Sequence, residues 1–80
     1  MDEIPLGTMV QVLADFDRFG GASLGLIAWE LFVPEAAVAP AWSAAVAGGL
    51  VAEAGHDPTY DERLWRLTAS GWARLHERQG

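Results

Sequence analysis

The segment from Ile27 to Val51 limits the possible folds of this chain more than any other part of it. Its apolar residues recur at the spacing that lets two short helices cross over a shared core and lead into a strand. These positions are Ile27, Ala28, Leu31, Val33, Val38, Trp42, Val46, Leu50 and Val51. Pro34 separates the two apolar sets, and Gly48-Gly49 follows the second. The pattern therefore predicts a helix-turn-helix followed by a strand.

The outward face of the second of these helices carries no side chain suited to reading DNA bases. Base edges are read mainly by Arg, Lys, Asn and Gln, none of which occurs between residues 35 and 47. The outward positions are expected to be Glu35, Ala36, Ala37, Ala39, Ala41, Ser43 and Ala44. Ser43 is thus the sole polar uncharged group available for a base.

The composition indicates one domain over residues 1–80, with its core between about residues 5 and 76. The chain has 80 residues, 51% of them hydrophobic, which suffices for one small core. It has no cysteine, so neither a disulfide framework nor a thiolate metal site is available. We therefore expect a cytoplasmic protein without a cofactor or bound metal.

Charge is distributed unevenly along the chain. Residues 1–55 contain seven acids and one base, a net charge of −6, whereas residues 56–80 contain four acids and four bases, a net charge of zero. Phosphate neutralisation supplies much of the affinity of proteins for DNA, so the acidic part starts with an electrostatic penalty. An acidic surface by itself is also ordinary for a soluble domain.

Helices are expected on both sides of the turn between residues 20 and 23. The first covers residues 8–19, with Thr8 as its N-cap, and ends at Gly20-Gly21. Ser23 caps a second helix that ends at Pro34, and a third runs from about residue 35 to residue 47. Its inward side chains are expected to be Val38, Trp42, Ala45 and Val46. Pro40 leaves open a shorter third helix that would begin near it.

The remainder of the chain predicts a hairpin and a last helix. Residues 50–54 and 62–67 read as strands, and residues 55–61 read as the loop between them. Thr68 then caps a helix over residues 69–77, with Trp72 and Leu75 on its core side. Trp42 and Trp65 also fall on core positions.

This order of elements resembles the winged helix-turn-helix domain, and residues 63–75 resemble the passage from wing to helix in PadR and MarR-like regulators. The likeness lies in Leu67-Thr68, two variable residues and Gly71, and it extends over residues 8–75. It implies an α+β fold with a three-helix core, a two-stranded wing hairpin and a C-terminal helix. It also implies a DNA-binding transcriptional regulator as one candidate function. The contacts to DNA would then come from Ser43, Arg63, Arg66, Arg74 and Arg78.

A second segment, residues 19–28, is similar to the start of FeoC-like proteins, short winged helices associated with ferrous-iron transporters. That likeness implies a transporter-associated function as a further alternative. The wing cysteines of that family are absent from this sequence, so its iron-binding group is not expected here.

The second helix is apolar nearly all round. Besides its inner stripe it carries Leu26, Trp29, Phe32 and Val33, and Glu30 is its only charge. Either the last helix covers the outer side chains, or Trp29 and Phe32 belong to an exposed patch covered by a partner protein or a second copy. Ala41 and Ala44 would extend that patch. A phage-type inhibitor of a nucleic-acid-handling complex belongs to the same class of function.

Other sites receive little support from the sequence. His56 and His76 have no metal-ligand spacing, and no nucleophile motif surrounds a serine, so no catalytic activity is expected. Residues 31–52 contain one charge, but prolines and a glycine pair interrupt them, which argues against a membrane span. We therefore expect a non-enzymatic winged-helix protein that acts through protein contacts in a regulatory assembly, with DNA binding as the alternative.

Overall fold

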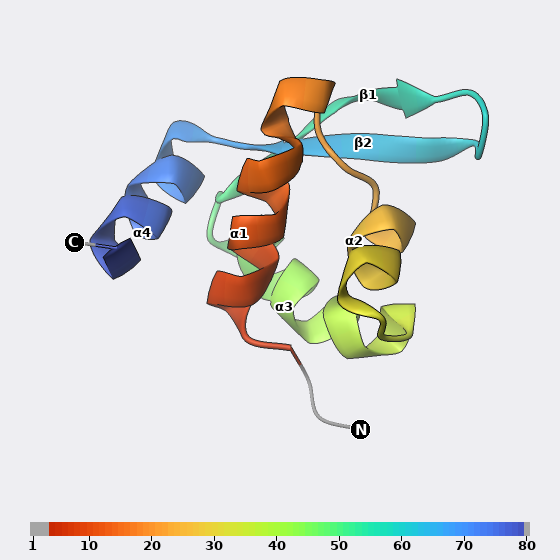
Figure 1. Cartoon of the computed structure of the whole chain (residues 1–80). Coiled ribbons are helices and arrows are strands. Elements are labelled where there is room, and N and C mark those ends of the chain that lie inside the picture. Colours follow the sequence, from red (N-terminus) through yellow and green to blue (C-terminus); the bar gives the residue numbers. More distant parts are fainter. Residues whose placement is uncertain (1–3, 80) are drawn as a thin grey trace.

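The computed structural model describes residues 4–79, and it describes side chains as far as Glu77. Four α-helices and one antiparallel hairpin make up this part of the chain, so the α+β class expected from the sequence is confirmed (Figure 1). In chain order the elements are α1 (Leu6–Phe16), a 3-10 turn (Asp17–Phe19), α2 (Leu24–Leu31), α3 (Glu35–Ala47), β1 (Val51–Asp57), β2 (Glu62–Leu67) and α4 (Ala69–Gln79).

The start of α1 corrects the expected cap at Thr8. Pro5 is the N-cap residue, and its carbonyl accepts hydrogen bonds from the backbone N–H groups of Thr8 and Met9 at 3.1 and 3.3 Å. Proline suits this place because its φ is fixed and the first helical turn needs no N–H donor from it. Thr8 therefore lies inside the first turn. The far end of α1 tightens into the 3-10 turn and stops at Gly20.

The expected cap of α2 is confirmed, because the Ser23 hydroxyl accepts a hydrogen bond from the N–H of Leu26 at 3.1 Å. The helix ends at Leu31, before Pro34, and Pro34 is the N-cap residue of α3. The longer of the two expected third helices is the one observed, with Pro40 inside it. Pro40 leaves the carbonyl of Ala36 without its helical donor, and residue 36 is exposed, so water can satisfy that carbonyl.

The hairpin is longer than expected. Residues 55–57 were expected in the loop, but they pair with residues 62–64, so the turn shrinks to residues 58–61. A bulge between Glu53 and Gly55 adjusts the register. The Thr59 N–H donates to the Asp57 carboxylate at 2.9 Å, which stabilises the turn locally.

A short bridge joins the hairpin to the segment between α1 and α2. Ala22 and Trp65 exchange two backbone hydrogen bonds of 3.0 and 2.8 Å. This close approach requires Gly21, because a Cβ there would collide with the carbonyl oxygen of Trp65, and because its φ is +114°. The hairpin consequently lies across the ends of α1 and α2 (Figure 1).

The core lies between α1, α2, α3 and the base of the hairpin, and Leu75 of α4 completes it. Its most deeply buried side chains are Met9, Val10, Leu13, Ile27 and Val38. Trp42 and Trp65 are half-buried against it, edge to face with ring centroids 5.0 Å apart. The Thr68 hydroxyl accepts the N–H of Gly71 at 3.2 Å, which confirms the expected cap of α4.

The inner face of α3 differs from the expected one. Ala37 and Ala41, expected to face outward, are buried at 7% and 6% exposure, whereas Val46, expected inward, is 46% exposed. The buried stripe runs through Val38, Ala41 and Ala45, and alanine at two of these places lets α3 lie close to α1 and α2. Within residues 4–79, none of the helices combines the length and the apolar character required of a membrane span.

Candidate protein-binding surface

Two large aromatic side chains are exposed to solvent at the C-terminal end of α2. Trp29 is 70% exposed and Phe32 is 90% exposed, which agrees with the second of the two alternatives that the sequence left open, whereas the other three tryptophans are partly buried. We call the group formed by Trp29, Glu30, Phe32 and Glu35 the α2 corner. It comprises the last turn of α2 and the first turn of α3, which meet at one end of the molecule (Figure 1).

The structure does not use α4 to cover α2, so that alternative is wrong. α4 packs against α1 and β2, on the side of α1 away from α2 (Figure 1). Ile27 and Ala28 fill the inner side of α2, and the helix turns Trp29 away from them because neighbouring positions differ by about 100°. Trp29 is therefore left facing solvent.

The backbone at Phe32 is unusual for a residue with a bulky side chain. Phe32 has φ 58° and ψ 40°, in the left-handed region. Its N–H donates to the carbonyl of Trp29 at 3.2 Å, and the N–H of Val33 donates to that of Ala28 at 3.1 Å. Together these bonds form a Schellman motif, in which the left-handed position is usually glycine. A phenylalanine there is strained, and its exposed ring recovers little energy by packing.

The α2 corner has negative charge and no compensating cation of its own. Glu30 and Glu35 are both exposed, and neither forms an ion pair or a side-chain hydrogen bond with the described residues. Glu35 lies in the first turn of α3, where the helix dipole favours an acid. Glu30 lies in the last turn of α2, where the dipole disfavours one.

The outer face of α3 continues this surface without further charge. Ala44 is exposed as expected, whereas the other alanine assigned to the interface, Ala41, is buried and cannot contact a partner. The exposed residues of α3 beyond Glu35 are Ala36, Ala39, Pro40, Ser43, Ala44, Val46 and Ala47. Small side chains let another backbone approach this face closely.

Two of the candidate DNA-contacting arginines form ion pairs with acids of this chain. Arg66 holds Asp17 through two hydrogen bonds of 3.0 Å, and Arg63 lies 3.6 Å from Glu53. The hydrogen bonds and charge of Arg66 lower the pKa of the Asp17 carboxyl, and Asp17 raises that of Arg66 in the same way. Arg74 is exposed on α4 and has no ion pair with any side chain up to residue 77.

Two further DNA-contact candidates remain. Ser43 is exposed on α3, on a different element from each of the arginines. Arg78 lies outside the described side chains. The DNA-contact candidates thus lie on three elements, α3, β2 and α4, and two of the arginines are paired with acids of this chain.

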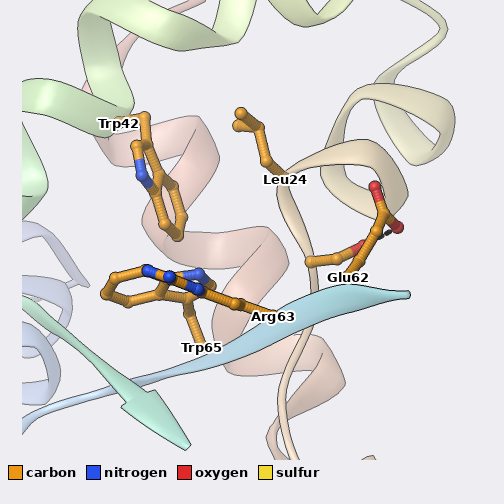
Figure 2. Close-up of a pocket in the computed structure, with 6 residues that line it drawn as sticks. Leu24, Trp42, Glu62, Arg63 and Trp65 are labelled. Atoms are coloured by element: carbon orange, nitrogen blue, oxygen red, sulfur yellow. Dashed lines mark hydrogen bonds between the residues drawn. The ribbon is translucent and has the colours of Figure 1, made fainter. Parts of the chain in front are cut away.

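A shallow depression lies between α2, α3 and the hairpin (Figure 2). It has a volume of about 240 Å³, below the range of roughly 300–1,000 Å³ that is typical of small-molecule sites. The lining residues are Ser23, Leu24, Trp42, Glu62, Arg63 and Trp65. Sequence analysis did not single out Glu62, whose carboxylate accepts the Ser23 hydroxyl at 2.9 Å and thereby ties β2 to the N-terminus of α2.

The two histidines do not build a metal site with the described residues. His56 Nε2 lies 2.7 Å from the Asp61 carboxylate at the exposed tip of the hairpin, and His76 lies beside the Trp72 ring on α4. Among residues 4–77, no three His, Asp or Glu side chains come close enough together to hold a metal ion. Tyr60, which sequence analysis overlooked, is 73% exposed at the hairpin tip.

Comparison of the chain with protein-family models, with curated proteins and with solved structures found no match.

Proposed function

We propose that this chain is a non-enzymatic winged-helix module that acts through protein contacts in a regulatory assembly. Trp29 and Phe32 are the anchors of its interface, and Ala44 on α3 lies at the margin. The candidate base-reading helix, α3, serves as part of a protein-binding face in this proposal, because its outer side chains are mostly alanine.

The arrangement of elements supports the winged-helix part of the proposal. Three helices precede an antiparallel hairpin and a fourth helix follows it, which is the order that the resemblance implies. The Ala22–Trp65 bridge adds a short third strand segment to the hairpin from the connection between α1 and α2. This bridge fixes the hairpin against the three-helix core, as a wing requires.

The observation that carries the functional part is the strained, exposed Phe32 beside the exposed Trp29. A fold that needed only to be stable would place glycine at the left-handed position and a polar residue at the exposed one. Strained backbone of this kind is found preferentially at functional sites, and large exposed aromatics are the commonest anchors of protein interfaces. Protein binding explains both features together.

The arrangement of the arginines favours protein contacts over DNA contacts. Binding to phosphates needs free cations on one face, and two of the candidate arginines already neutralise acids of this chain. A gel-shift titration in low salt separates the two functions. The protein-binding proposal expects no retarded duplex at tens of micromolar protein, and a salt-sensitive shift that Arg63→Gln and Arg74→Gln abolish would contradict it.

The direct test is affinity capture from an extract of the cell of origin, with the purified domain as bait. The proposal expects at least one protein that the wild-type chain retains and that Trp29→Ala and Phe32→Gly both lose. Tyr60→Ala is the matched control, because Tyr60 is equally exposed but lies on the hairpin tip. Retention of the same proteins by all four baits would refute the proposal.

A further inference from the structure

We infer that the partner of the α2 corner is a basic protein segment, one that presents apolar side chains flanked by lysine or arginine. The inference rests on the proposed function and deepens it, because it names the chemistry of the partner. The two aromatic rings indicate that a partner binds, and the charges around Trp29 and Phe32 indicate what kind of partner it is.

The first argument is the one-sided charge of this face. Between residues 19 and 52 the sequence contains two acids, Glu30 and Glu35, and no base. The two acids flank Phe32 along the chain, and both are exposed. Among the described residues neither has a cationic partner. A partner with positive charge at these places would complement them, whereas an acidic partner would be repelled.

The second argument is the direction of the α2 dipole. The C-terminal end of a helix carries partial negative charge, which basic residues in the last turn usually offset. The last turn of α2 has no basic residue and contains Glu30 instead. The C-terminal end of α2 and the Glu30 carboxylate thus both make the electrostatic potential beside Trp29 more negative. A cation from another molecule would be stabilised by both, and it could also lie against the exposed indole ring.

A second copy of this chain fits the same surface less well. In a two-fold symmetric dimer the same patch is used twice, so Glu30 and Glu35 would face an equally acidic surface. The segment that forms α2 and α3, from residue 19 to residue 52, contains no base to offset that repulsion. The partner is therefore a different polypeptide.

The shape of the surface fits a segment that lies along it. The two rings alone cover less than the roughly 800 Å² per side that a stable interface needs. The outer face of α3 supplies the remaining area, and its exposed residues from Ala36 to Ala47 are small or apolar and uncharged. A partner helix or strand could approach this face closely while its cations reach the two glutamates.

The test is a selection of random 16-residue peptides displayed on phage against the purified domain, followed by binding measurements on the selected peptides. Each selected peptide is then tested for binding to the Phe32→Gly and Trp29→Ala variants of the domain. Peptides that bind these variants more weakly than the wild type are called corner-dependent. Corner-dependent peptides are then measured against Glu30→Gln/Glu35→Gln, with Glu77→Gln as the matched control on α4. Sedimentation of the domain alone reports self-association.

The inference expects corner-dependent peptides with net positive charge. Their Kd for the double variant Glu30→Gln/Glu35→Gln should be about three- to tenfold higher than for the wild type, and their Kd for Glu77→Gln should be unchanged. Corner-dependent peptides that are neutral or acidic and indifferent to the two glutamates would overturn the inference and leave the proposed function intact. So would a dimer that Phe32→Gly dissociates. Peptides that all ignore Trp29 and Phe32 would instead overturn the proposed function, and the inference with it.

Discussion

Replacing Phe32 by glycine should stabilise the protein while it removes an interface anchor. Phe32 occupies the left-handed position of the Schellman motif that ends α2, with φ 58° and ψ 40°. In an L-residue this conformation brings Cβ close to the backbone, and glycine, which lacks Cβ, adopts it freely. The ring is 90% exposed, so its removal takes little packing away.

The size of the effect follows from two opposing contributions. Relief of the left-handed strain should stabilise the folded state by about 1–2 kcal/mol. Glycine also makes the unfolded chain more flexible, which offsets about 0.4–1 kcal/mol of this gain. The net increase in the free energy of unfolding should thus be about 0.8 kcal/mol, within limits of about 0–1.6 kcal/mol. For a domain of this size, an increase of about 0.8 kcal/mol corresponds to a rise in Tm of roughly 3–6 °C.

Urea unfolding followed by tryptophan fluorescence measures this change directly, because three of the four tryptophans pack against the core. Phe32→Ala is the matched control: it removes the same ring but keeps a Cβ, so it should remain within about 0.5 kcal/mol of the wild type. If Phe32→Gly were no more stable than Phe32→Ala, the argument that Phe32 is strained would be refuted.

Three other predictions concern the remaining structure. Trp29→Ala should change the free energy of unfolding by less than about 0.5 kcal/mol, whereas Trp65→Ala should lower it by about 2–3 kcal/mol. The difference is expected because only the Trp65 ring packs on the core, and urea unfolding measures both variants. Gly21→Ala should lower the free energy of unfolding by more than about 2 kcal/mol, and Gly55→Ala should lower it by less than about 0.5 kcal/mol. The reason is that a Cβ at residue 21 would collide with the Trp65 backbone, whereas a Cβ at residue 55 would meet no atom. Equal effects would contradict the proposed role of the bridge. The pKa of Asp17 is lowered by its arginine partner, so its stabilising effect is complete above the unfolded pKa of about 3.8 and disappears as pH falls through the lower folded value. Wild type and Asp17→Asn should therefore differ in stability near neutral pH and converge as the pH falls below the unfolded pKa of about 3.8, and a constant difference would argue against this ion pair.

Signals that act over a few residues could be found in the sequence. Ser23 and Thr68 were expected as caps, and both accept the hydrogen bonds that a cap accepts, from Leu26 and Gly71. The limits of β2 were predicted correctly as well. Each of these features depends on groups three to five residues apart, so a linear pattern contains the necessary information.

Features that depend on rotation or on distant partners were missed. Ala41 was expected to be exposed and Val46 to be buried, and the reverse holds, because the neighbours of α3 decide which of its faces is inside. The ion pair between Asp17 and Arg66 joins residues 49 positions apart in the chain. Both charges are evident in the sequence, but no local pattern indicates that Asp17 and Arg66 contact each other.

The sequence by itself determined the number and order of the helices, most of their ends and the surplus of acid in residues 1–55. These depend on local hydrogen bonds, on hydrophobic periodicity and on simple counting. The tertiary structure alone decided that α4 packs against α1, that Trp29 and Phe32 stay exposed, and that Phe32 adopts the left-handed conformation. The physical reason is that burial is a property of the assembled chain: a side chain is covered only if another element reaches it, and periodicity does not say which element will.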